Sequence, residues 1–257
     1  MEVSNNKTEF MAKLYLGDCL KVLDKVRDGS IDLVLCDPPY GTTACKWDSI
    51  IPFNEMWAQL LRVTKPTSAI CIFGTEPFSS YLRMSNVKMF RYDWIWHKSR
   101  PSGMALSKYQ PMRNHETISV FYKKNPVFNK QMEPRAESAQ QRYKQGKFNR
   151  FGSGNSTTGI GKIQGHLGQV SELRNPTTVR FFQCVTDRSE NKHPTQKPVP
   201  LMEYLVKTYT NPGDSVLDFT MGSGSSGVAA IKLNRLFTGI ENDEKYFGIA
   251  SERIGSA

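Results

Sequence analysis

Short apolar runs alternate with helical periodicity along most of the chain. Continuous apolar runs at Ile31–Cys36, 69–73 and 117–122 predict buried strands. Apolar residues that recur every three or four positions at 19–26 and Phe53–Val63 predict amphipathic helices. Strands that alternate with helices favour an α/β fold with a doubly wound, mostly parallel sheet.

The pattern stops near residue 125 and returns near residue 192. Residues 125–191 are rich in Gly, Gln, Asn, Ser and Arg and show little apolar periodicity, which predicts a loop-rich insertion. Beyond it we expect two strands and three helices, at Ser215–Asp218, Leu236–Glu241, 200–210, 225–234 and 243–254. The sequence therefore predicts two halves of one domain, 1–124 and 192–257, separated by the insertion 125–191.

Charge adds a polyanion partner to this picture. The 257 residues are 39% hydrophobic, enough for a sizeable core, and 34 Lys and Arg against 24 Asp and Glu give a net charge of +10. Residues 88–113 hold six basic residues and one acidic residue, and residues 125–192 hold eleven and five. This concentration favours nucleic acid as a partner, although a solvated basic surface is the alternative.

Other classes of site lack support in the sequence. No apolar run reaches 18 residues, so we expect no membrane-spanning helix. The N-terminal residues MEVSNNKTEF do not resemble a signal peptide, and we expect a cytoplasmic protein. The five cysteines form no CxxC pair, so neither a metal site nor a disulfide framework is predicted.

A glycine-rich turn indicates a nucleotide-type cofactor. The segment SVLDFTMGSGSSG places Gly222, Gly224 and Gly227 between a predicted strand and a predicted helix. Glycines allow close backbone approach to a ligand, and the helix N-terminus offers free amides. Glu241 ends the next strand, 17 residues after Gly224, where a carboxylate accepts hydrogen bonds from ribose hydroxyls. The motif alone is compatible with NAD, with S-adenosylmethionine, or with a turn kept for packing.

The tetrapeptide Asp37-Pro38-Pro39-Tyr40 follows a predicted strand directly, at the sheet edge where ligands bind in doubly wound folds. The prolines stiffen the turn and supply no N–H, so the carbonyls of Asp37 and Pro38 are free to face a pocket. A carboxylate and a carbonyl together accept both hydrogens of an exocyclic amine, and Tyr40 stacks on the ring that carries it. The alternative is a plain turn, because Asp-Pro and Pro-Pro are common in turns.

These motifs jointly resemble the amino-methylating DNA methyltransferases that use S-adenosylmethionine, in particular their β class. The resemblance rests on DPPY at 37–40, HPTQKP at 193–198, DFTMGSGSSG at 218–227 and GIE at 239–241, in that order. It covers about residues 15–254 except the insertion, which corresponds to the target-recognition region of the class. It implies a Rossmann-like methyltransferase fold. The family usually has DPFMGSGT where this chain has Phe219 and Thr220, which bears on how the cofactor packs there.

The resemblance implies roles for the matching residues. The target base would be bound by the tetrapeptide Asp37, Pro38, Pro39 and Tyr40. Cofactor contacts would fall into three groups: the adenine at Asp18 and Cys19, the methionine end at His193, Thr195 and Lys197, and the rest of the molecule along Asp37, Asp218, Thr220, Gly222, Ser223, Gly224 and Glu241. Basic residues of the insertion would meet DNA, mostly at phosphates: Arg135, Arg142, Lys144, Lys147 and Arg150.

The resulting expectation is methyl transfer from S-adenosylmethionine to the 6-amino group of adenine in DNA, by base flipping and without a covalent intermediate. Cytosine 4-amino methylation is the nearer alternative, although cytosine members more often begin the tetrapeptide with Ser. The glycine-rich turn alone would also suit an NAD-dependent oxidoreductase, and the basic insertion alone would suit a non-enzymatic nucleic-acid-binding module. The resemblance also allows a homodimer and a cognate restriction endonuclease as partners.

Overall fold

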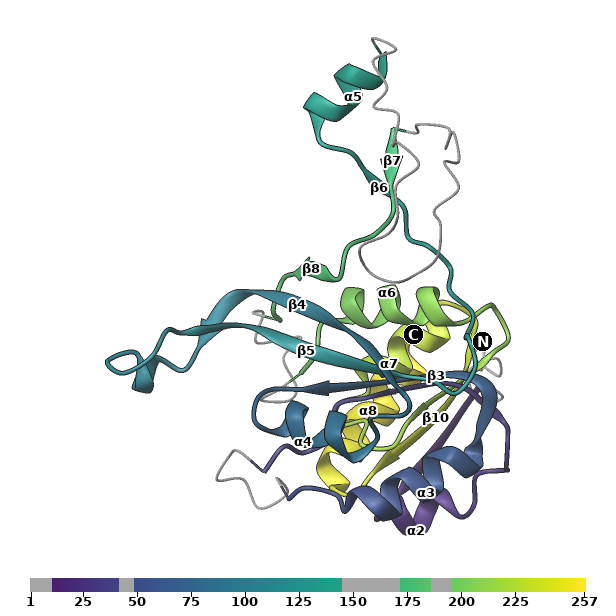
Figure 1. The fold of residues 1–257 in the computed structure, drawn as a ribbon. Coiled ribbons are helices and arrows are strands. Elements are labelled where there is room, and N and C mark those ends of the chain that lie inside the picture. The colour runs from purple at the N-terminus through teal and green to yellow at the C-terminus, as the bar shows by residue number, and fades with distance from the viewer. Residues whose placement is uncertain (1–10, 42–48, 145–171, 186–195) are drawn as a thin grey trace, which may run out of the picture. The chain divides into compact units, whose positions relative to one another are not determined.

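The computed structural model describes residues 11–41, 49–144, 172–185 and 196–257. The chain divides into two compact units, of which the larger contains Met1–Asn129 and Thr178–Ala257 and the smaller contains Lys130–Thr177. The larger unit holds the sheet and the helices that cover it (Figure 1).

An eight-stranded sheet forms the centre of the larger unit. Its order is β1-β10-β9-β2-β3-β5-β4-β8. The first five are parallel neighbours: β1 (Ala12–Leu16), β10 (Leu236–Glu241), β9 (Ser215–Asp218), β2 (Ile31–Cys36) and β3 (Thr64–Gly74). Then β5 (Arg113–Phe121) pairs antiparallel with β3 and with β4 (Phe90–Ser102), and β8 (Val179–Phe182) runs parallel to β4 at the edge. The predicted α/β class with a mostly parallel sheet is confirmed.

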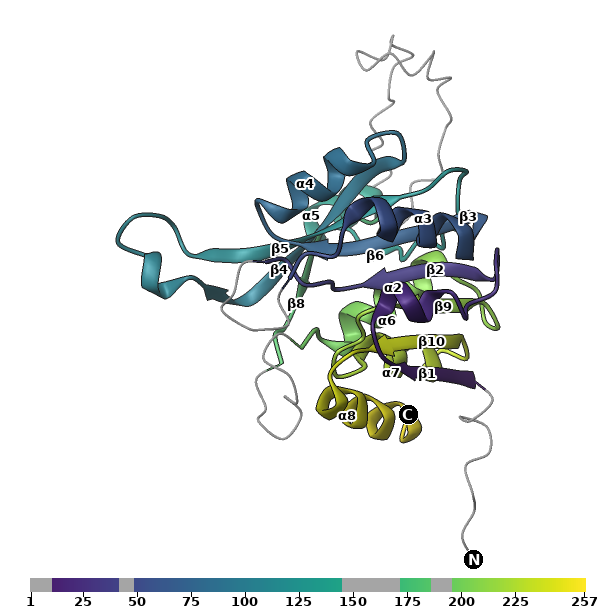
Figure 2. The ribbon, with the colours of Figure 1, turned by 90° about the horizontal axis from the view of Figure 1, so that it is seen from below.

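Alternate residues of the central strands serve two cores. Leu33 and Leu35 of β2 pack in one core with α6 (Val199–Tyr209), α7 (Ser225–Lys232) and α8 (Glu244–Gly255). Val34 and Cys36 pack in the other with α2 (Cys19–Leu23), α3 (Phe53–Val63) and α4 (Phe78–Ser85). Strand side chains point alternately to opposite faces, so the sheet is sandwiched between two helical layers (Figure 1 and Figure 2). Within the described segments, no helix combines the length and the apolar character needed to cross a membrane.

The elements that differ from the sequence prediction depend on long-range pairing. The strand predicted at 69–73 lies within the longer β3. The strand predicted at 117–122 ends one residue earlier, and β5 begins earlier than predicted because β4 and β5 extend each other as a hairpin. The helix predicted at 19–26 ends at Leu23, after which Lys25 and Val26 donate three-residue turn hydrogen bonds. The sequence pattern did not predict β1, α4 or β4.

The smaller unit, Lys130–Thr177, covers fewer residues than the insertion predicted at 125–191. Residues 125–129 belong to the larger unit, and β8 adds Val179–Phe182 to the main sheet by pairing with β4. Within the smaller unit, β6 (Glu133–Pro134) pairs antiparallel with β7 (Leu173–Arg174), and α5 covers Glu137–Lys144. Arg174 also forms an ion pair with Glu133 at 3.0 Å.

Candidate active site

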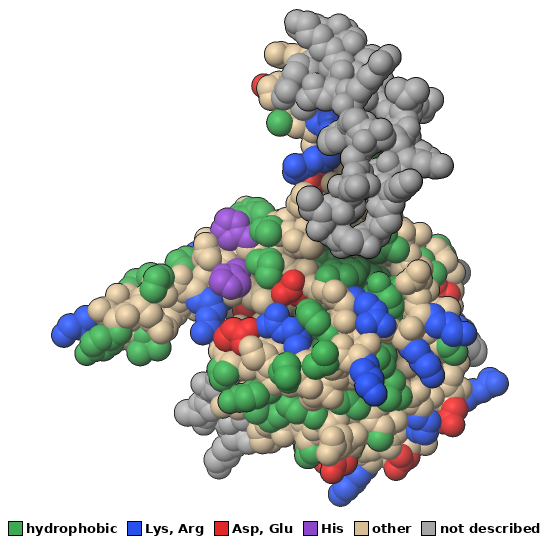
Figure 3. Space-filling model, in the orientation of Figure 1, with side chains coloured by type: hydrophobic (Ala, Val, Ile, Leu, Met, Phe, Trp, Pro, Cys, Tyr) green, Lys and Arg blue, Asp and Glu red, His purple; other side chains and the backbone are tan. Residues whose placement is uncertain are grey.

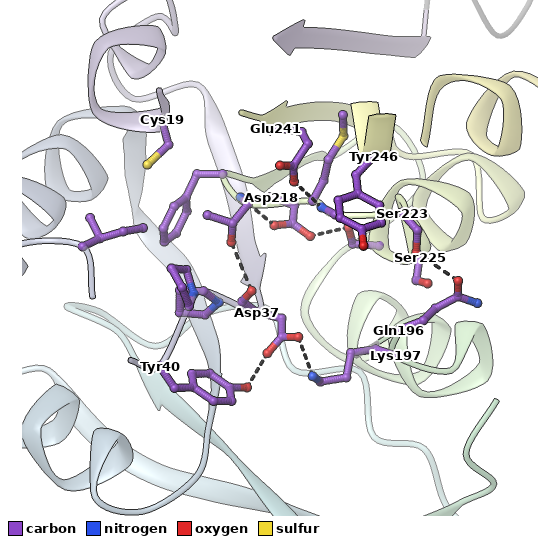
Figure 4. A pocket seen from close by; sticks show the side chains of 18 of the residues that line it. Cys19, Asp37, Tyr40, Gln196, Lys197, Asp218, Ser223, Ser225, Glu241 and Tyr246 are labelled. Atoms are coloured by element: carbon purple, nitrogen blue, oxygen red, sulfur yellow. Dashed lines mark hydrogen bonds and ion pairs between the residues drawn. The ribbon is translucent and has the colours of Figure 1, made fainter. Parts of the chain in front are cut away.

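A cavity of about 670 Å³ opens at the carboxyl ends of β1, β2, β9 and β10. The turns after these strands meet there, and residues of β4, Glu116 of β5 and the segment before α6 also contribute to the lining. Figure 4 shows side chains from these separate elements pointing into one space. Ligand sites of doubly wound sheets lie at this edge, so the cavity is the candidate site.

Asp37 is fixed from three directions. Its carboxylate accepts hydrogen bonds from the Tyr40 hydroxyl on one oxygen and from the Lys197 ammonium on the other (Figure 4). Its main-chain carbonyl accepts a hydrogen bond from Thr220 Oγ1 at 3.2 Å. The Tyr40 ring lies 5.0 Å from that of Phe78, which orients its hydroxyl toward Asp37. The carboxylate therefore has a defined position before any ligand binds.

Buried charges of both signs surround this carboxylate. Lys197 Nζ lies 3.4 Å from Glu116 Oε2, and Lys98 Nζ lies 3.2 Å from Glu116 Oε1. Burial raises the pKa of Asp37 above its ordinary value, although Lys197 acts in the opposite direction. Burial alone would lower the pKa of Lys197, but Asp37 and Glu116 raise it above its usual range. Lys197 is therefore a stable ammonium between two carboxyl groups.

The glycine-rich turn is organised by Glu241. Gly222 and Gly224 have φ values of 52° and 78°, which side-chain-bearing residues rarely adopt. Gly222 N–H donates to Glu241 Oε2 at 2.8 Å, and the N–H groups of Asn242 and Asp243 donate to Oε1 at 2.9 Å each. A carboxylate has about four acceptor positions, so Glu241 keeps about one for a ligand hydroxyl. The ribose contact that the sequence pattern assigns to this carboxylate stays a prediction.

Ser223 joins the glycine-rich turn to the segment that carries Lys197. Its hydroxyl donates to Gln196 Oε1 at 3.0 Å (Figure 4), and its carbonyl accepts a hydrogen bond from Arg253 of α8. Two segments that the family resemblance assigns to one cofactor thus meet in space.

Asp218 stabilises the same turn from inside. Its carboxylate accepts hydrogen bonds from Ser226 Oγ at 2.5 Å and from the N–H of Thr220 at 3.1 Å. The side chain is buried, which raises the pKa of Asp218 to about 7. Beside it, Phe219 is buried in the core on the α2–α4 side of the sheet.

Asp18 and Cys19 line the cavity at the start of α2. Asp18 caps α2, because its carboxylate accepts hydrogen bonds from the N–H groups of Leu20 at 2.9 Å and Lys21 at 3.4 Å. Burial raises the pKa of the Cys19 thiol to about 11 and also raises that of the fully buried Cys36. Both thiols are therefore mainly protonated at neutral pH, which makes them poor nucleophiles.

Most of the predicted site residues line this one cavity: Asp18, Cys19, Asp37, Pro38, Pro39, Tyr40, Lys197, Asp218, Thr220, Gly222, Ser223 and Glu241. Gly224 precedes α7 as its N-cap, and its missing side chain leaves room for Ala250 and Ile254. His193 and Thr195 lie outside the described residues. Among the described residues, no cluster of three or more His, Cys, Asp or Glu side chains is placed to hold a metal ion.

Most of the side chains predicted to contact DNA lie outside the part of the chain that the structure describes. Lys147 and Arg150 lie outside the described residues, as do the side chains of Arg142 and Lys144. Arg135 belongs to the smaller unit, where its Nε donates to the carbonyl of Leu173 at 3.1 Å.

Sequence reasoning missed Glu116 and Gln196 as members of the site. Gln196 lies inside HPTQKP, so the motif itself contained the signal. Glu116 is an acidic residue directly before the apolar run TISVF, and its only sequence signal is that position at a strand. Its importance comes from a neighbour 81 positions away, Lys197.

A doubly wound sheet with a glycine-rich turn and a carboxylate at the carboxyl ends of its strands is typical of α/β enzymes that bind a nucleotide-type cofactor. Within that class, the chain belongs to the N6/N4 methyltransferase family, described as DNA methylase, whose model matches residues 31–252. The predicted family of amino-methylating DNA methyltransferases is thereby confirmed. Membership favours methyl transfer over the oxidoreductase and the non-enzymatic binding module.

Known proteins similar to the chain agree with this assignment. The Type II methyltransferase M1.MboII of Moraxella bovis is 30% identical, over 93% of this chain and 95% of that protein. The crystal structure of the M1.HpyAVI–SAM complex has a TM-score of 0.63 at 22% identity, over 95% of this chain and 99% of that one. The PvuII DNA methyltransferase, described as cytosine-N4-specific, has a TM-score of 0.65 at 16% identity, over 94% and 86%. These solved structures share the fold.

Proposed function

We propose that this DNA methyltransferase transfers a methyl group from S-adenosylmethionine to the exocyclic 6-amino group of adenine, which is flipped out of the duplex into the cavity beside Asp37. The observation that carries the proposal is the position of the Asp37 carboxylate. It lies at the end of β2, in the same cavity as the glycine-rich turn and Glu241. Acceptor and cofactor turn therefore line the same cavity.

The residues present fit S-adenosylmethionine. The cavity volume is within the usual range for small-molecule sites. Glu241 has about one acceptor position left for a ribose hydroxyl, and Asp18 and Cys19 line the part where the resemblance places the adenine. When bound, the cofactor supplies a methyl group activated by a positively charged sulfur. A solved structure that shares the fold is a SAM complex.

The protein's part in the chemistry is to raise the electron density on the target nitrogen. The lone pair of an aromatic exocyclic amine is delocalised into the ring, which makes the amine a poor nucleophile. The Asp37 carboxylate and the Pro38 carbonyl would each accept a hydrogen bond from one N–H of the amine. Because both acceptors are already fixed in place, they need no reorganisation during the reaction. The Asp37 carbonyl already accepts from Thr220, so Pro38 is the main-chain acceptor in this proposal. Two of the roughly four acceptor positions on the Asp37 carboxylate are used by Tyr40 and Lys197, which leaves room for the amine.

Adenine is favoured over cytosine by the first residue of the tetrapeptide, Asp37, because cytosine members more often carry Ser there. The fold does not distinguish the bases, since the PvuII enzyme of similar fold is described as cytosine-N4-specific. The test is nucleoside mass spectrometry of DNA treated with the purified protein, followed by methylation-aware sequencing. N6-methyladenine supports the proposal, and N4-methylcytosine alone would replace it by cytosine 4-amino methylation.

An arm formed by β4 and β5 offers a described surface for DNA. Arg100, Lys108 and Arg113 of this arm are exposed, and residues 98–113 contain no acidic residue. Arg100 also lines the cavity, so the basic surface continues to its mouth. Figure 3 shows a basic side chain beside hydrophobic ones at the far end of the arm. In the connection between β4 and β5, Tyr109 is 80% exposed, and the centroid of its ring lies 5.7 Å from Lys108 Nζ. Cations and an exposed ring suit phosphates and bases. A homodimer and a cognate endonuclease stay predictions.

A further inference from the structure

A chain of alternating charges runs from Asp37 along the wall of the cavity. Lys197 Nζ contacts Asp37 Oδ2 and lies 3.4 Å from Glu116 Oε2, and Glu116 Oε1 lies 3.2 Å from Lys98 Nζ. The side chains of Lys197, Lys98 and Glu116 are 5%, 9% and 14% exposed. Such burial is costly for single charges, and two cations beside two carboxylates balance it. Because this row of charges is buried and ends at the proposed acceptor, we expect it to affect the acceptor rather than to form a solvated surface.

Glu116 is the member of this row with spare capacity. Its Oε2 atom is buried and forms no hydrogen bond among the described residues, because 3.4 Å with this geometry leaves Lys197 only as an ion-pair partner. The ammonium instead donates its hydrogen bond to Asp37. Lys197 thus lies between one carboxylate that it binds closely and a second that is available to receive it.

We propose that Glu116 is a positioning residue for methyl transfer, which holds the Lys197 ammonium while the Asp37 carboxylate accepts a hydrogen bond from the target amine. This inference rests on the proposed function, since it takes Asp37 as the acceptor. Without Glu116, Lys197 has Asp37 as its sole close counter-ion among the described residues, and the amine must compete with a full ammonium for that carboxylate. With Glu116, the ammonium is shared, and Asp37 stays a strong acceptor.

The direction of the pH effect follows from the groups around Asp37. Its titratable and charged neighbours come from every adjoining element: Tyr40 after β2, Cys36 on β2, Lys197 before α6, Glu116 on β5, with Lys98 on β4 behind it, and Asp218 on β9. Glu116 raises the pKa of Asp37, so Glu116→Gln should lower it. Removing the Lys98 cation acts in the opposite sense, so Lys98→Met should raise it. Transfer requires ionised Asp37, and the acidic limb of the kcat–pH profile should move accordingly.

The experiment measures single-turnover methylation of duplex DNA by the full chain across pH. We expect Glu116→Gln to lower the rate about 10- to 100-fold, as misplacement near a reacting centre does, with affinities for S-adenosylmethionine and DNA within about threefold of the parent. Its acidic limb should move to lower pH, and that of Lys98→Met to higher pH. Glu116→Asp, which keeps the charge, should recover part of the rate.

Asp93→Asn serves as the matched control. It removes a carboxylate of β4 that pairs with Arg83 at 3.3 Å and is 34% exposed. Its rate and its pH profile should equal those of the parent.

Opposite shifts of the two limbs support the inference, and an unshifted limb in Glu116→Gln overturns it, whatever the rate. If Glu116→Gln fails to fold, the shift in Lys98→Met decides in the same way. Asp37→Ala, measured in parallel, distinguishes a failure of the role of Glu116 from a failure of the proposed function. If Asp37→Ala is inactive while Glu116→Gln behaves like the parent, only the role of Glu116 fails. If Asp37→Ala retains the parent rate, the proposed function fails with it.

Discussion

Thr220 Oγ1 donates a hydrogen bond of 3.2 Å to the main-chain carbonyl of Asp37, a residue 183 positions earlier in the chain. Thr220 also lies 2.9 Å from Cys36 Sγ, so the glycine-rich turn is attached to the end of β2 at two points. This is the position where the family usually has Phe. At this departure from the family pattern, the chain therefore has a polar link between the cofactor turn and the acceptor.

Thr220→Val should remove this link while keeping the shape of the side chain. We expect the free energy of unfolding to fall by about 1–2 kcal/mol, since the Asp37 carbonyl loses its partner, and the single-turnover rate to fall as Asp37 shifts. Urea denaturation and rapid-quench methylation measure the two effects. Thr208→Val removes a comparable bond, to the Tyr204 carbonyl at 2.8 Å in α6, and should change stability alone. Equal rates in both variants would contradict the link.

Glu241→Ala should weaken S-adenosylmethionine binding by about 1–3 kcal/mol, the range for losing a charge-assisted hydrogen-bond partner. It should also lower thermal stability, because three main-chain N–H groups lose their acceptor. Calorimetry and thermal unfolding measure these changes. Glu244→Gln, an exposed change at the start of α8, is the control. Unchanged cofactor affinity in Glu241→Ala would remove this residue from the site.

Asp218 should make stability depend on pH. Its pKa is about 7 in the folded protein and about 3.9 in an unfolded chain, so folding favours the protonated form. The contribution of protonated Asp218 to the free energy of unfolding is complete below about pH 4. It is lost as pH rises to about 7, by at most about 1.4 kcal/mol per pH unit. Urea denaturation at pH 5 and pH 8 should show a smaller difference for Asp218→Asn than for the parent. An identical difference would mean that Asp218 ionises normally.

DNA binding should depend on salt through two sets of cations. Each phosphate contact contributes about 0.9 to the slope of log affinity against log salt. Neutralising Arg142, Lys144 and Lys147 together should therefore weaken binding and flatten the slope. The set Arg100, Lys108 and Arg113 on the β4–β5 arm should act in the same way. Fluorescence anisotropy at several salt concentrations measures both, and a set that leaves the slope unaltered does not contact phosphates.

Sequence reasoning succeeded where a pattern is local. The helix Phe53–Val63 has the predicted bounds, because its buried residues Met56, Trp57, Leu60 and Val63 have helical spacing. The strands Ile31–Cys36, Ser215–Asp218 and Leu236–Glu241 also have the predicted bounds. Each lies between two other strands of the sheet, and most of its residues are buried.

It failed where the determinant lies elsewhere in the chain. In β4, Trp94 and Trp96 are buried, but the segment DWIWHKSRPS around them gives no long continuous apolar run, and the strand is long because β5 and β8 pair with it. The resemblance assigns Lys197 of HPTQKP to the cofactor, which stays a prediction, and the motif did not indicate that its ammonium contacts Asp37. The pairing of Lys197 with Glu116 joins two distant segments, and no periodicity or motif in either segment encodes it.

The central claim, that Asp37 accepts a hydrogen of the target amine, is tested most directly by single-turnover methylation with Asp37→Ala and Asp37→Asn, enzyme in excess over duplex DNA, so that product release does not contribute. We predict a rate loss on the order of 10²–10³ or more for Asp37→Ala, with cofactor affinity largely intact, because a preorganised acceptor is lost. Asp37→Asn keeps one acceptor oxygen without the charge and should retain a trace of activity above Asp37→Ala. Methyl transfer by Asp37→Ala at close to the parent rate would contradict the account.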